Sequence, residues 1–284
     1  MTTTLATRSP ALPLSLATEP RRIVHRTRGR RHGPITRLVS PGDVGELIKP
    51  FVFLDFFSME STSGGGFGWH PHSGIATLTV LLEGSTRYEE TTGAKGTLPR
   101  GGVEWMRAGN GVWHTGGPAT TGRVTGYQLW VALPPELENG PSASHYVQPG
   151  DVPTADGVRV ILGHHGGAGS PIAAPETMTY LVVELKDGER WTYVPPAGHT
   201  VAWIAVHQGA VATPAPVSTG ELAVFEPSGE PITFVAQGDA AFMLGSAIPH
   251  PHDLVLGMYS VHTSREALAR GEAEIRRIGQ SLRG

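Results

Sequence analysis

The sequence predicts an all-β protein built from two barrels, with a short helix at its C-terminal end. Apolar runs of strand length recur at short intervals between glycine-rich turns, which is typical of a barrel or a sandwich. The chain contains 38 glycines and 24 prolines among 284 residues, enough for many tight turns. Only 264–278 places apolar side chains at helical spacing, so we expect one helix at about 264–280, with Ser264 as its N-cap.

The first half of the chain contains the clearest strands. Residues 1–20 show no strand or helix pattern, and we interpret them as a disordered tail. The arginine-rich stretch 21–37 is typical of a solvated edge strand, with a patch for an anionic partner as the alternative. The run 51–57 predicts a buried strand, and the Gly- and Ser-rich segment 58–68 predicts a mobile loop. Further strands are expected at 75–82, 86–91, 103–106 and 127–133.

The second half of the chain repeats the first weakly. V-L-L-E-G-S (80–85) is echoed by A-V-H-Q-G-A (205–210), which implies a second barrel of the same type. Strands are expected there at 158–162, 178–185, 201–206, 222–225, 232–236 and 240–245. We therefore expect an N-terminal domain over 21–140 and a C-terminal domain over 141–284 that ends in the helix.

Composition and charge exclude several classes of protein. The net charge of -3 disfavours a dedicated nucleic-acid binder, and no apolar stretch is long enough to cross a membrane. The chain has no cysteine and hence no disulfide or thiol nucleophile, so any metal must be held by His, Asp or Glu. The first 20 residues do not resemble a signal peptide, and we expect a cytoplasmic protein.

Three histidines form the clearest candidate site. His70 and His72 lie in W-H-P-H-S-G, where the two-residue period of extended chain puts both imidazoles on one side. Pro71 between them restricts the backbone. His114, in G-N-G-V-W-H-T-G-G, completes a triad if two hairpins bring its strand alongside. Three imidazoles bind zinc, copper, iron or nickel and leave positions open for a substrate. The alternative is a set of hydrogen-bonded pocket histidines.

Other polar residues carry weaker signals. A second H-P-H, at His250 and His252, is interpreted as a polar turn, with a second metal site as the alternative. His164 and His165 precede a glycine-rich stretch and are expected in a solvated loop. Glu104 lies in an expected strand, and we expect it to point outward. The alternative is that it orients a ligand histidine.

The longer motifs resemble the pirin family of the cupin superfamily. The resemblance rests on F-V-F-L-D-F-F, G-F-G-W-H-P-H-S-G-I-A-T-L-T-V-L-L-E-G and G-G-V-E-W-M-R-A-G-N-G-V-W-H, and it is dense over 35–118. It implies two cupin barrels face to face in one chain, a bicupin, with one divalent metal in the first barrel only. The family's three histidine ligands carry over to His70, His72 and His114. Because the two barrels already pair within one chain, we expect a monomer.

The sequence departs from the family's metal motif at three positions. The family's fourth ligand is a Glu two residues after the third histidine, where this chain has Gly116. Ser73 and Ala76 stand where the family's H-P-H-R-G-x-E has Arg and Glu. The remaining ligands are neutral, so a divalent ion would keep its full charge for water, dioxygen or an anionic substrate. In the second barrel, the positions that match the H-x-H pair hold Pro195 and Ala197, neither of which coordinates metal.

The resemblance implies two functions. The first is a mononuclear-metal dioxygenase of the quercetin 2,3-dioxygenase type, which acts on a flavonol-like or other oxygen-rich small molecule. Fe(II) is the favoured metal, with Zn, Ni, Cu or Mn as alternatives. The second is a non-enzymatic metal- or redox-sensing regulator that binds another protein. A cupin that binds a small ligand without metal is a third interpretation. No catalytic side chain is assigned, because no general base is evident without the family's Glu.

Overall fold

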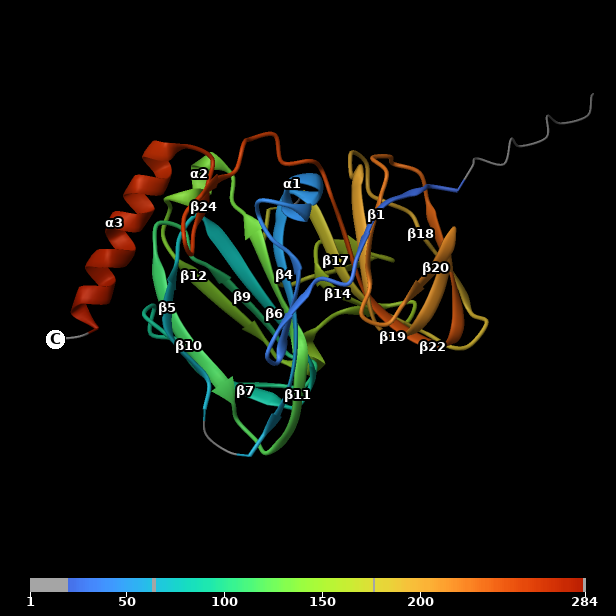
Figure 1. Ribbon diagram of the computed structural model, residues 1–284, viewed down its shortest axis with the longest axis horizontal. Helices are drawn as coiled ribbons and strands as arrows, with labels where there is room; N and C mark the ends of the chain where they lie inside the picture. The colour runs from blue at the N-terminus through green and yellow to red at the C-terminus, as the bar shows by residue number, and fades with distance from the viewer. Residues whose placement is uncertain (1–19, 63–64, 176, 283–284) are drawn as a thin grey trace, which may run out of the picture.

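The computed structural model describes residues 20–62, 65–175 and 177–282. These residues form two antiparallel β-lobes that lie side by side, and the helix α3 (Arg265–Ser281) covers the outer side of the first lobe (Figure 1). The predicted all-β fold with a C-terminal helix is therefore confirmed. The predicted disordered tail lies outside the described residues, except for Pro20.

Two sheets form the first lobe. The larger has the strand order β12-β9-β6-β11-β4-β3-β2, and the smaller has the order β5-β10-β7-β8. The larger sheet contains β2 (Arg30–His32), β3 (Ile35–Val39), β4 (Phe51–Ser61), β6 (Ile75–Glu83), β9 (Val103–Arg107), β11 (Gly122–Ala132) and β12 (Ala143–Val147). The smaller sheet contains β5 (Phe67–His72), β7 (Ser85–Glu90), β8 (Lys95–Pro99) and β10 (Val112–Pro118). Both sheets contribute side chains to one cavity.

A nine-stranded sheet forms the second lobe. Its order is β1-β21-β19-β22-β17-β14-β13, with β18 paired to β22 and β20 paired to β19. Its strands are β1 (Ile23–Thr27), β13 (Thr154–Ala155), β14 (Val158–Leu162), β17 (Met178–Leu185), β18 (Arg190–Tyr193), β19 (Val201–Thr213), β20 (Ala215–Ser218), β21 (Leu222–Phe225) and β22 (Ile232–Ala247). The smaller elements are α1 (Val44–Ile48), α2 (Pro135–Glu138), a 3-10 turn (Pro149–Asp151), the hairpin of β15 (His164–His165) with β16 (Ala168–Gly169), and the hairpin of β23 (Val255–Leu256) with β24 (Val261–His262).

Two strand pairings and one set of helix contacts cross the expected boundary between residues 140 and 141. β1 pairs with β21 of the second lobe, although it precedes the whole first lobe in sequence. β12 pairs with β9 of the first lobe. After β22 the chain returns to the first lobe, where α3 contacts β10 and β5. Chain from the other half of the sequence thus extends one sheet of each lobe, and β1 and β12 form the terminal strands there.

The prediction of a mobile loop over 58–68 is wrong at both ends of that segment, which belong to strands. β4 continues to Ser61, which pairs with Gly122 of β11 in a ladder that runs regularly from there to Trp130. β5 already begins at Phe67, opposite Gly116 of β10. Pairing to a long neighbouring strand outweighs the weak strand propensity of serine and glycine. Residues 63 and 64 lie outside the described residues.

Helix α3 begins as the sequence predicts. The Ser264 hydroxyl oxygen accepts a hydrogen bond from the backbone N–H of Ala267 at 3.1 Å, which caps the first turn. The buried residues of α3 recur at spacings of four, as an amphipathic helix requires. They are Ala267, Gly271, Ile275 and Gly279. In the described part of the chain, no helix is long and apolar enough to pass through a bilayer.

Trp203 stands in a core that the two lobes share. Phe51 of the first lobe packs edge-on against Trp203, with 5.5 Å between ring centroids, and Tyr180 of β17 lies 5.7 Å away. The fully buried indole lies over Gly245, where any Cβ would overlap it. One apolar cluster therefore runs through both lobes. We expect the lobes to unfold together, because neither can lose its core residues without exposing those of the other.

Replacing Trp203 with alanine should lower the free energy of unfolding by about 3–5 kcal/mol, because it leaves a cavity between the lobes. Scanning calorimetry should show one transition in the wild type and one transition at a lower Tm in Trp203→Ala. The exposed side chain of Val194 provides the control, since Val194→Ala should change stability by less than about 0.5 kcal/mol. Two separate transitions in the wild type would contradict a shared core.

Candidate metal centre

The structure brings the three candidate ligands, His70, His72 and His114, together on β5 and β10. His70 lies directly opposite His114 in the antiparallel pair, and the strand period puts His72 on the same side as His70. Ring centroids are 4.2 Å apart for His70 and His114, 5.1 Å for His72 and His114, and 5.2 Å for His70 and His72. One ring nitrogen of each histidine lies within 4.8 Å of the other two. Over residues 20–62, 65–175 and 177–282, no other group of three metal-binding side chains meets that spacing.

Two of the three imidazoles have a hydrogen-bond acceptor at Nδ1. The Nδ1 of His70 lies 2.8 Å from the carbonyl oxygen of Gly68, and the Nδ1 of His72 lies 3.1 Å from that of Tyr259. A carbonyl oxygen only accepts, so Nδ1 carries the proton in both rings and Nε2 keeps its lone pair. The Nε2 atoms of His72 and His114 are buried without a hydrogen-bond partner. Buried lone pairs that converge without a donor fit a metal ion, and the Nδ1 contacts are those that metal-ligating histidines make.

Burial also keeps these imidazoles neutral. It is the main cause that lowers the pKa of His70, and it lowers the pKa of His72 to about 3, with a further contribution from His70. Burial likewise lowers the pKa of His114 well below its ordinary value, assisted by the two neighbouring imidazoles. Neutral imidazole is the form that binds metal, so the ligands are ready to coordinate without first losing protons.

A cavity of about 320 Å³ opens beside the histidines and is lined by both sheets of the first lobe. Phe53 and Trp130 stack in parallel along it, with centroids 4.0 Å apart, and Trp130 meets His72 edge-on at 4.9 Å. Phe67 and Tyr259 line the same cavity and are partly exposed to solvent. The site therefore combines flat apolar walls with a polar corner at the histidines, as small-molecule pockets do.

Glu104 points into this cavity, so the expectation that it faces outward is wrong. Its side chain is 7% exposed, and its Oε1 atom lies 4.0 Å from Nδ1 of His114. Its neighbours on β9, Val103 and Trp105, are buried in the core shared with the second lobe. Both faces of β9 are therefore covered, and the inward face carries the carboxylate. Burial raises the pKa of Glu104 to about 7, opposed by hydrogen bonds from Thr79 and Tyr146.

The three positions that depart from the family motif lie in different surroundings. Gly116 lines the cavity on β10, two residues after His114, and offers no ligand atom. Ala76 is fully buried in the shared core. Ser73 is also fully buried, and its hydroxyl contacts Ser260 rather than the cavity.

The remaining histidine motifs do not add to the centre. His250 and His252 lie side by side, with ring centroids 5.3 Å apart, and they form no group with a third metal-binding side chain among the described residues. The solvated loop expected at His164 and His165 is wrong, because the two residues form β15 and the His165 ring meets Trp191 at 5.6 Å.

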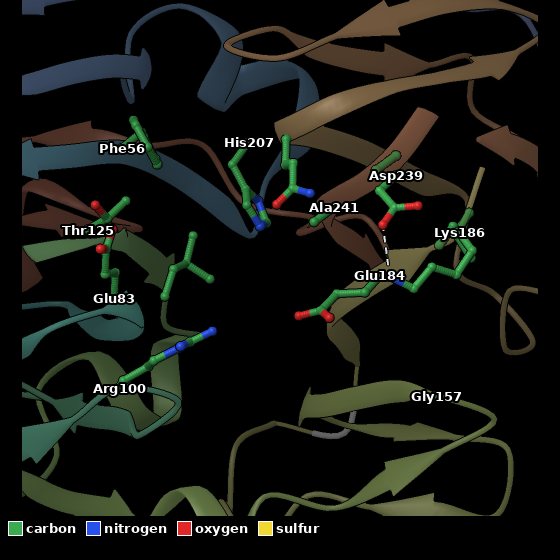
Figure 2. Close-up of a pocket in the computed structure, with 14 residues that line it drawn as sticks. Phe56, Glu83, Arg100, Thr125, Gly157, Glu184, Lys186, His207, Asp239 and Ala241 are labelled. Atoms are coloured by element: carbon green, nitrogen blue, oxygen red, sulfur yellow. Dashed lines mark hydrogen bonds and ion pairs between the residues drawn. The ribbon is translucent and has the colours of Figure 1, made fainter. Parts of the chain in front are cut away.

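A second cavity, of about 600 Å³, lies between the two lobes (Figure 2). Its lining is strongly polar and includes Arg100, Glu184 and His207, as well as the ion pair of Lys186 with Asp239 at 2.8 Å. Opposite charges face one another across it, and its lining residues belong to no metal-binding group among the described residues. The histidine cavity is therefore the better candidate for chemistry.

Comparison with known proteins agrees with this geometry. The family profile described as Pirin matches residues 34–131. A Pseudomonas aeruginosa protein named "Putative quercetin 2,3-dioxygenase" is 32% identical over 259 residues, which is 85% of this chain and 90% of the relative. A pirin-like protein of Caulobacter vibrioides is also 32% identical, over 76% of this chain and 81% of its own length.

Solved structures share the fold. A quercetin 2,3-dioxygenase from Acinetobacter baumannii superposes with a TM-score of 0.84 at 23% identity, over 91% of this chain and 97% of that one. A bacterial pirin from Escherichia coli in complex with nickel(II) gives a TM-score of 0.64 at 22% identity, over 81% and 98% of the two chains. The sequence identity, the paired β-lobes and the histidine triad lead to one conclusion: the chain belongs to the pirin family.

Proposed function

We propose that this protein is a metal-dependent dioxygenase that acts on a flavonol-like or other oxygen-rich aromatic molecule. The observation that carries the proposal is the meeting of three neutral imidazoles, two of them with buried, unpartnered Nε2 atoms, at the end of an apolar cavity. The names of a relative and of a structural neighbour, both quercetin 2,3-dioxygenases by name, support the same reaction class. Nothing in the described residues favours the alternative of a regulator that acts through protein contacts.

His70, His72 and His114 would hold the metal. When bound, a divalent ion would supply a Lewis acid that polarises the oxygen atoms of the substrate and lowers the pKa of its hydroxyl group. Fe(II) is the metal that we propose first, and nickel is the metal of the Escherichia coli pirin structure. An all-imidazole site binds Fe(II) more weakly than Ni(II) or Cu(II), so availability rather than affinity would select iron.

The cavity suits a flat aromatic substrate. The stacked rings of Phe53 and Trp130 give it a planar wall, while Phe67, Met258 and Tyr259 line it with solvent-exposed apolar surface. A ring system seated against that wall would direct its oxygen substituents toward the imidazoles. The volume of about 320 Å³ lies at the small end of the range for ligand pockets, which is about 300–1,000 Å³.

Glu104 would act on the centre through His114. Its carboxylate faces Nδ1 of His114 at 4.0 Å, so it favours the tautomer that has the proton on Nδ1 and the lone pair on Nε2. Glu104 is therefore proposed as a positioning residue rather than a ligand. The cavity lining contains two carboxylates, Asp55 and Glu104; Asp55 is paired with Arg37, and Glu104 is the one that faces the triad.

Removing one imidazole should abolish tight metal binding. We expect His72→Ala to weaken Ni(II) binding by at least about 100-fold, because loss of a ligand exceeds the 10–100-fold effect of losing a group that only orients one. Competition with a chromophoric chelator would measure the affinity. His145→Ala, which removes an exposed imidazole on β12, should bind Ni(II) as the wild type does. Equal affinity in His72→Ala would contradict the triad as the site.

Oxygen consumption should depend on both the metal and the triad. Protein loaded separately with Fe(II), Ni(II), Cu(II) or Mn(II) should consume dioxygen with at least one member of a flavonol panel, as measured with an oxygen electrode. His72→Ala should lose this uptake, and His145→Ala should retain it. Failure of all four metal forms to consume oxygen with every flavonol would rule out the proposed reaction.

Converting the Glu104 carboxylate to an amide should weaken metal binding without abolishing it. Glu104→Gln keeps the shape but removes the carboxylate that faces Nδ1 of His114, so Ni(II) affinity should fall by about 10-fold, the lower end for orienting groups. Glu60→Gln, which makes the same change at an exposed position, is the control. An unchanged Ni(II) affinity in Glu104→Gln would show that the carboxylate does not position His114.

A further inference from the structure

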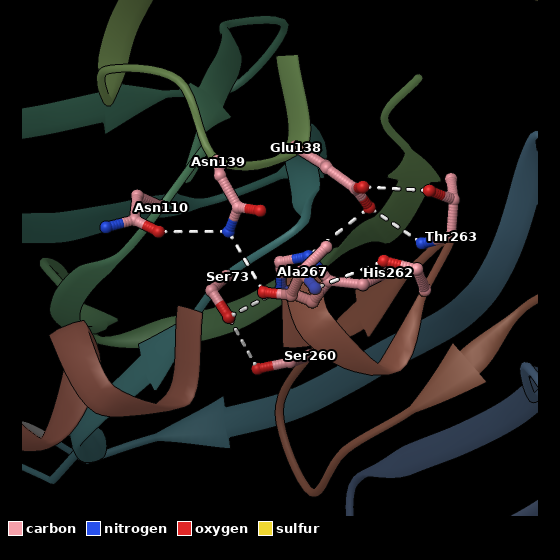
Figure 3. A network of polar contacts seen from close by, with 9 residues as sticks. Ser73, Asn110, Glu138, Asn139, Ser260, His262, Thr263 and Ala267 are labelled. Atoms are coloured by element: carbon pink, nitrogen blue, oxygen red, sulfur yellow. Dashed lines mark hydrogen bonds and ion pairs between the residues drawn. The ribbon is translucent and has the colours of Figure 1, made fainter. Parts of the chain in front are cut away.

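A buried polar network joins the end of the chain to the histidine-bearing lobe. We call residues 255–281 the C-terminal strap; it comprises β23, β24, their turn and α3. In Figure 3, Ser73 and Glu138 of the first lobe converge on His262 of the strap. The Ser73 hydroxyl lies 3.0 Å from Nε2 of His262, and Nδ1 of His262 lies 3.3 Å from the Glu138 carboxylate. All three side chains are at most 3% exposed.

The Ser–His–Glu arrangement is a tether and not a nucleophilic site. Gly271 of α3 lies directly over it: a Cβ at Gly271 would come within 2.5 Å of the Ser73 hydroxyl and 2.6 Å of Nε2 of His262. A substrate therefore has no room to approach the serine. The carboxylate of Glu138 is further engaged by Thr263, whose backbone N–H and hydroxyl donate to it at 2.7 and 2.8 Å. These bonds fix the strap at the start of α3.

The same tether sets the position of the carbonyl that His72 contacts. The Ser73 hydroxyl donates to the Ser260 hydroxyl at 2.8 Å, and the two residues form a parallel bridge. Ser73 follows His72 directly, and Ser260 follows Tyr259. The bridge therefore places the carbonyl oxygen of Tyr259 at 3.1 Å from Nδ1 of His72. In the described part of the chain, this carbonyl is the acceptor that Nδ1 of His72 contacts.

Helix α3 supports the other strand of the centre. The indole N–H of Trp113 donates to the carbonyl oxygen of Ile275 at 2.7 Å, and Trp113 directly precedes His114 on β10. Gly279 lets the helix approach the indole, because a Cβ there would come within 2.5 Å of it. Asn139 adds a hydrogen bond of 3.0 Å to the carbonyl oxygen of Ala267. The strap thus contacts residues adjacent to two of the three histidines.

We propose that the C-terminal strap is a positioning element of the metal centre. The Tyr259 carbonyl holds His72 in the tautomer whose Nε2 lone pair faces the other histidines, and Ser73, His262 and Glu138 hold that carbonyl in place. Metal affinity in the first lobe then depends on chain that lies almost 190 residues away in sequence. The inference rests on the proposed function only in assuming that the triad binds metal.

Two readouts on Glu138→Gln test the proposal. Glu138 touches no histidine of the triad. An amide keeps the size of its side chain, but it replaces one of the two oxygens that accept from Thr263 with an NH2 group, which cannot accept, and it removes the charge beside His262. In the metal-free protein, long-range proton–nitrogen NMR of the imidazoles should show His72 protonated on Nδ1 in the wild type and a tautomer mixture in the variant. Co(II) affinity, measured by chelator competition, should fall by about 10-fold, with a changed visible absorption spectrum of the bound Co(II).

The control removes an equally buried hydroxyl from the second lobe. Ser246 contacts the Tyr193 hydroxyl at 2.5 Å and Nδ1 of His199 at 3.0 Å, so Ser246→Ala also loses buried hydrogen bonds. It should lower Tm while leaving the His72 tautomer and Co(II) affinity unchanged. If Glu138→Gln does not fold, Ser73→Ala provides the smaller change, with the same two expected effects.

The outcomes separate the two proposals. A wild-type protein that binds no Co(II) would overturn the metal function, and the tautomer measurement would still decide whether the strap positions His72. A wild-type tautomer together with wild-type Co(II) affinity in the tether variants would overturn the strap proposal and leave the metal function standing. An altered tautomer with unchanged Co(II) affinity would also overturn it, since positioning would then have no consequence for the metal.

Discussion

Three neutral imidazoles aimed at one another are the constraint around which the first lobe is arranged. Two of their Nε2 atoms are buried without a donor, and an unpaired buried polar atom costs about 1–3 kcal/mol. In the absence of a metal, favourable contacts around the imidazoles have to offset this cost. The carbonyl oxygens of Gly68 and Tyr259 provide fixed acceptors on the Nδ1 sides, and the stacked Phe53 and Trp130 pack behind His72. A bound ion would satisfy both Nε2 atoms, and removal of this cost would contribute to the free energy of ion binding.

The second lobe supports the centre although the described part of it contributes no candidate ligand. Its core packs against β9 around Trp105 and leaves the other face of that strand to carry Glu104 into the cavity. Its last strand, β22, leads into the chain that returns to the first lobe as the strap. The shared core around Trp203 keeps the lobes in one orientation. Glu104 and the strap therefore keep fixed positions relative to the triad.

The sequence predicts the parts of this arrangement that depend on local spacing. The H-P-H motif with its strand period predicts that His70 and His72 lie on one side, and the capping residue Ser264 predicts the start of α3. Features that depend on pairing between distant segments are not visible in the sequence. Glu104 faces inward because another lobe covers the opposite face of β9, and a lone carboxylate within V-E-W-M is the one local sign of it. The Ser73–His262 contact joins residues 189 apart, and no local pattern marks it.

The placement of Glu104 also determines how charge would be distributed around a bound ion. Gly116 supplies no fourth ligand, so a divalent ion among neutral imidazoles would keep its charge for substrate oxygens that enter the cavity. Glu104 lies instead beside Nδ1 of His114, the nitrogen that faces away from the proposed coordination position. Its attraction for the ion acts across the imidazole ring and in a poorly solvated interior, where Coulomb interactions are stronger than in water. The carboxylate would thereby attract the ion through His114 without taking a coordination position, whereas a fourth ligand at position 116 would occupy one.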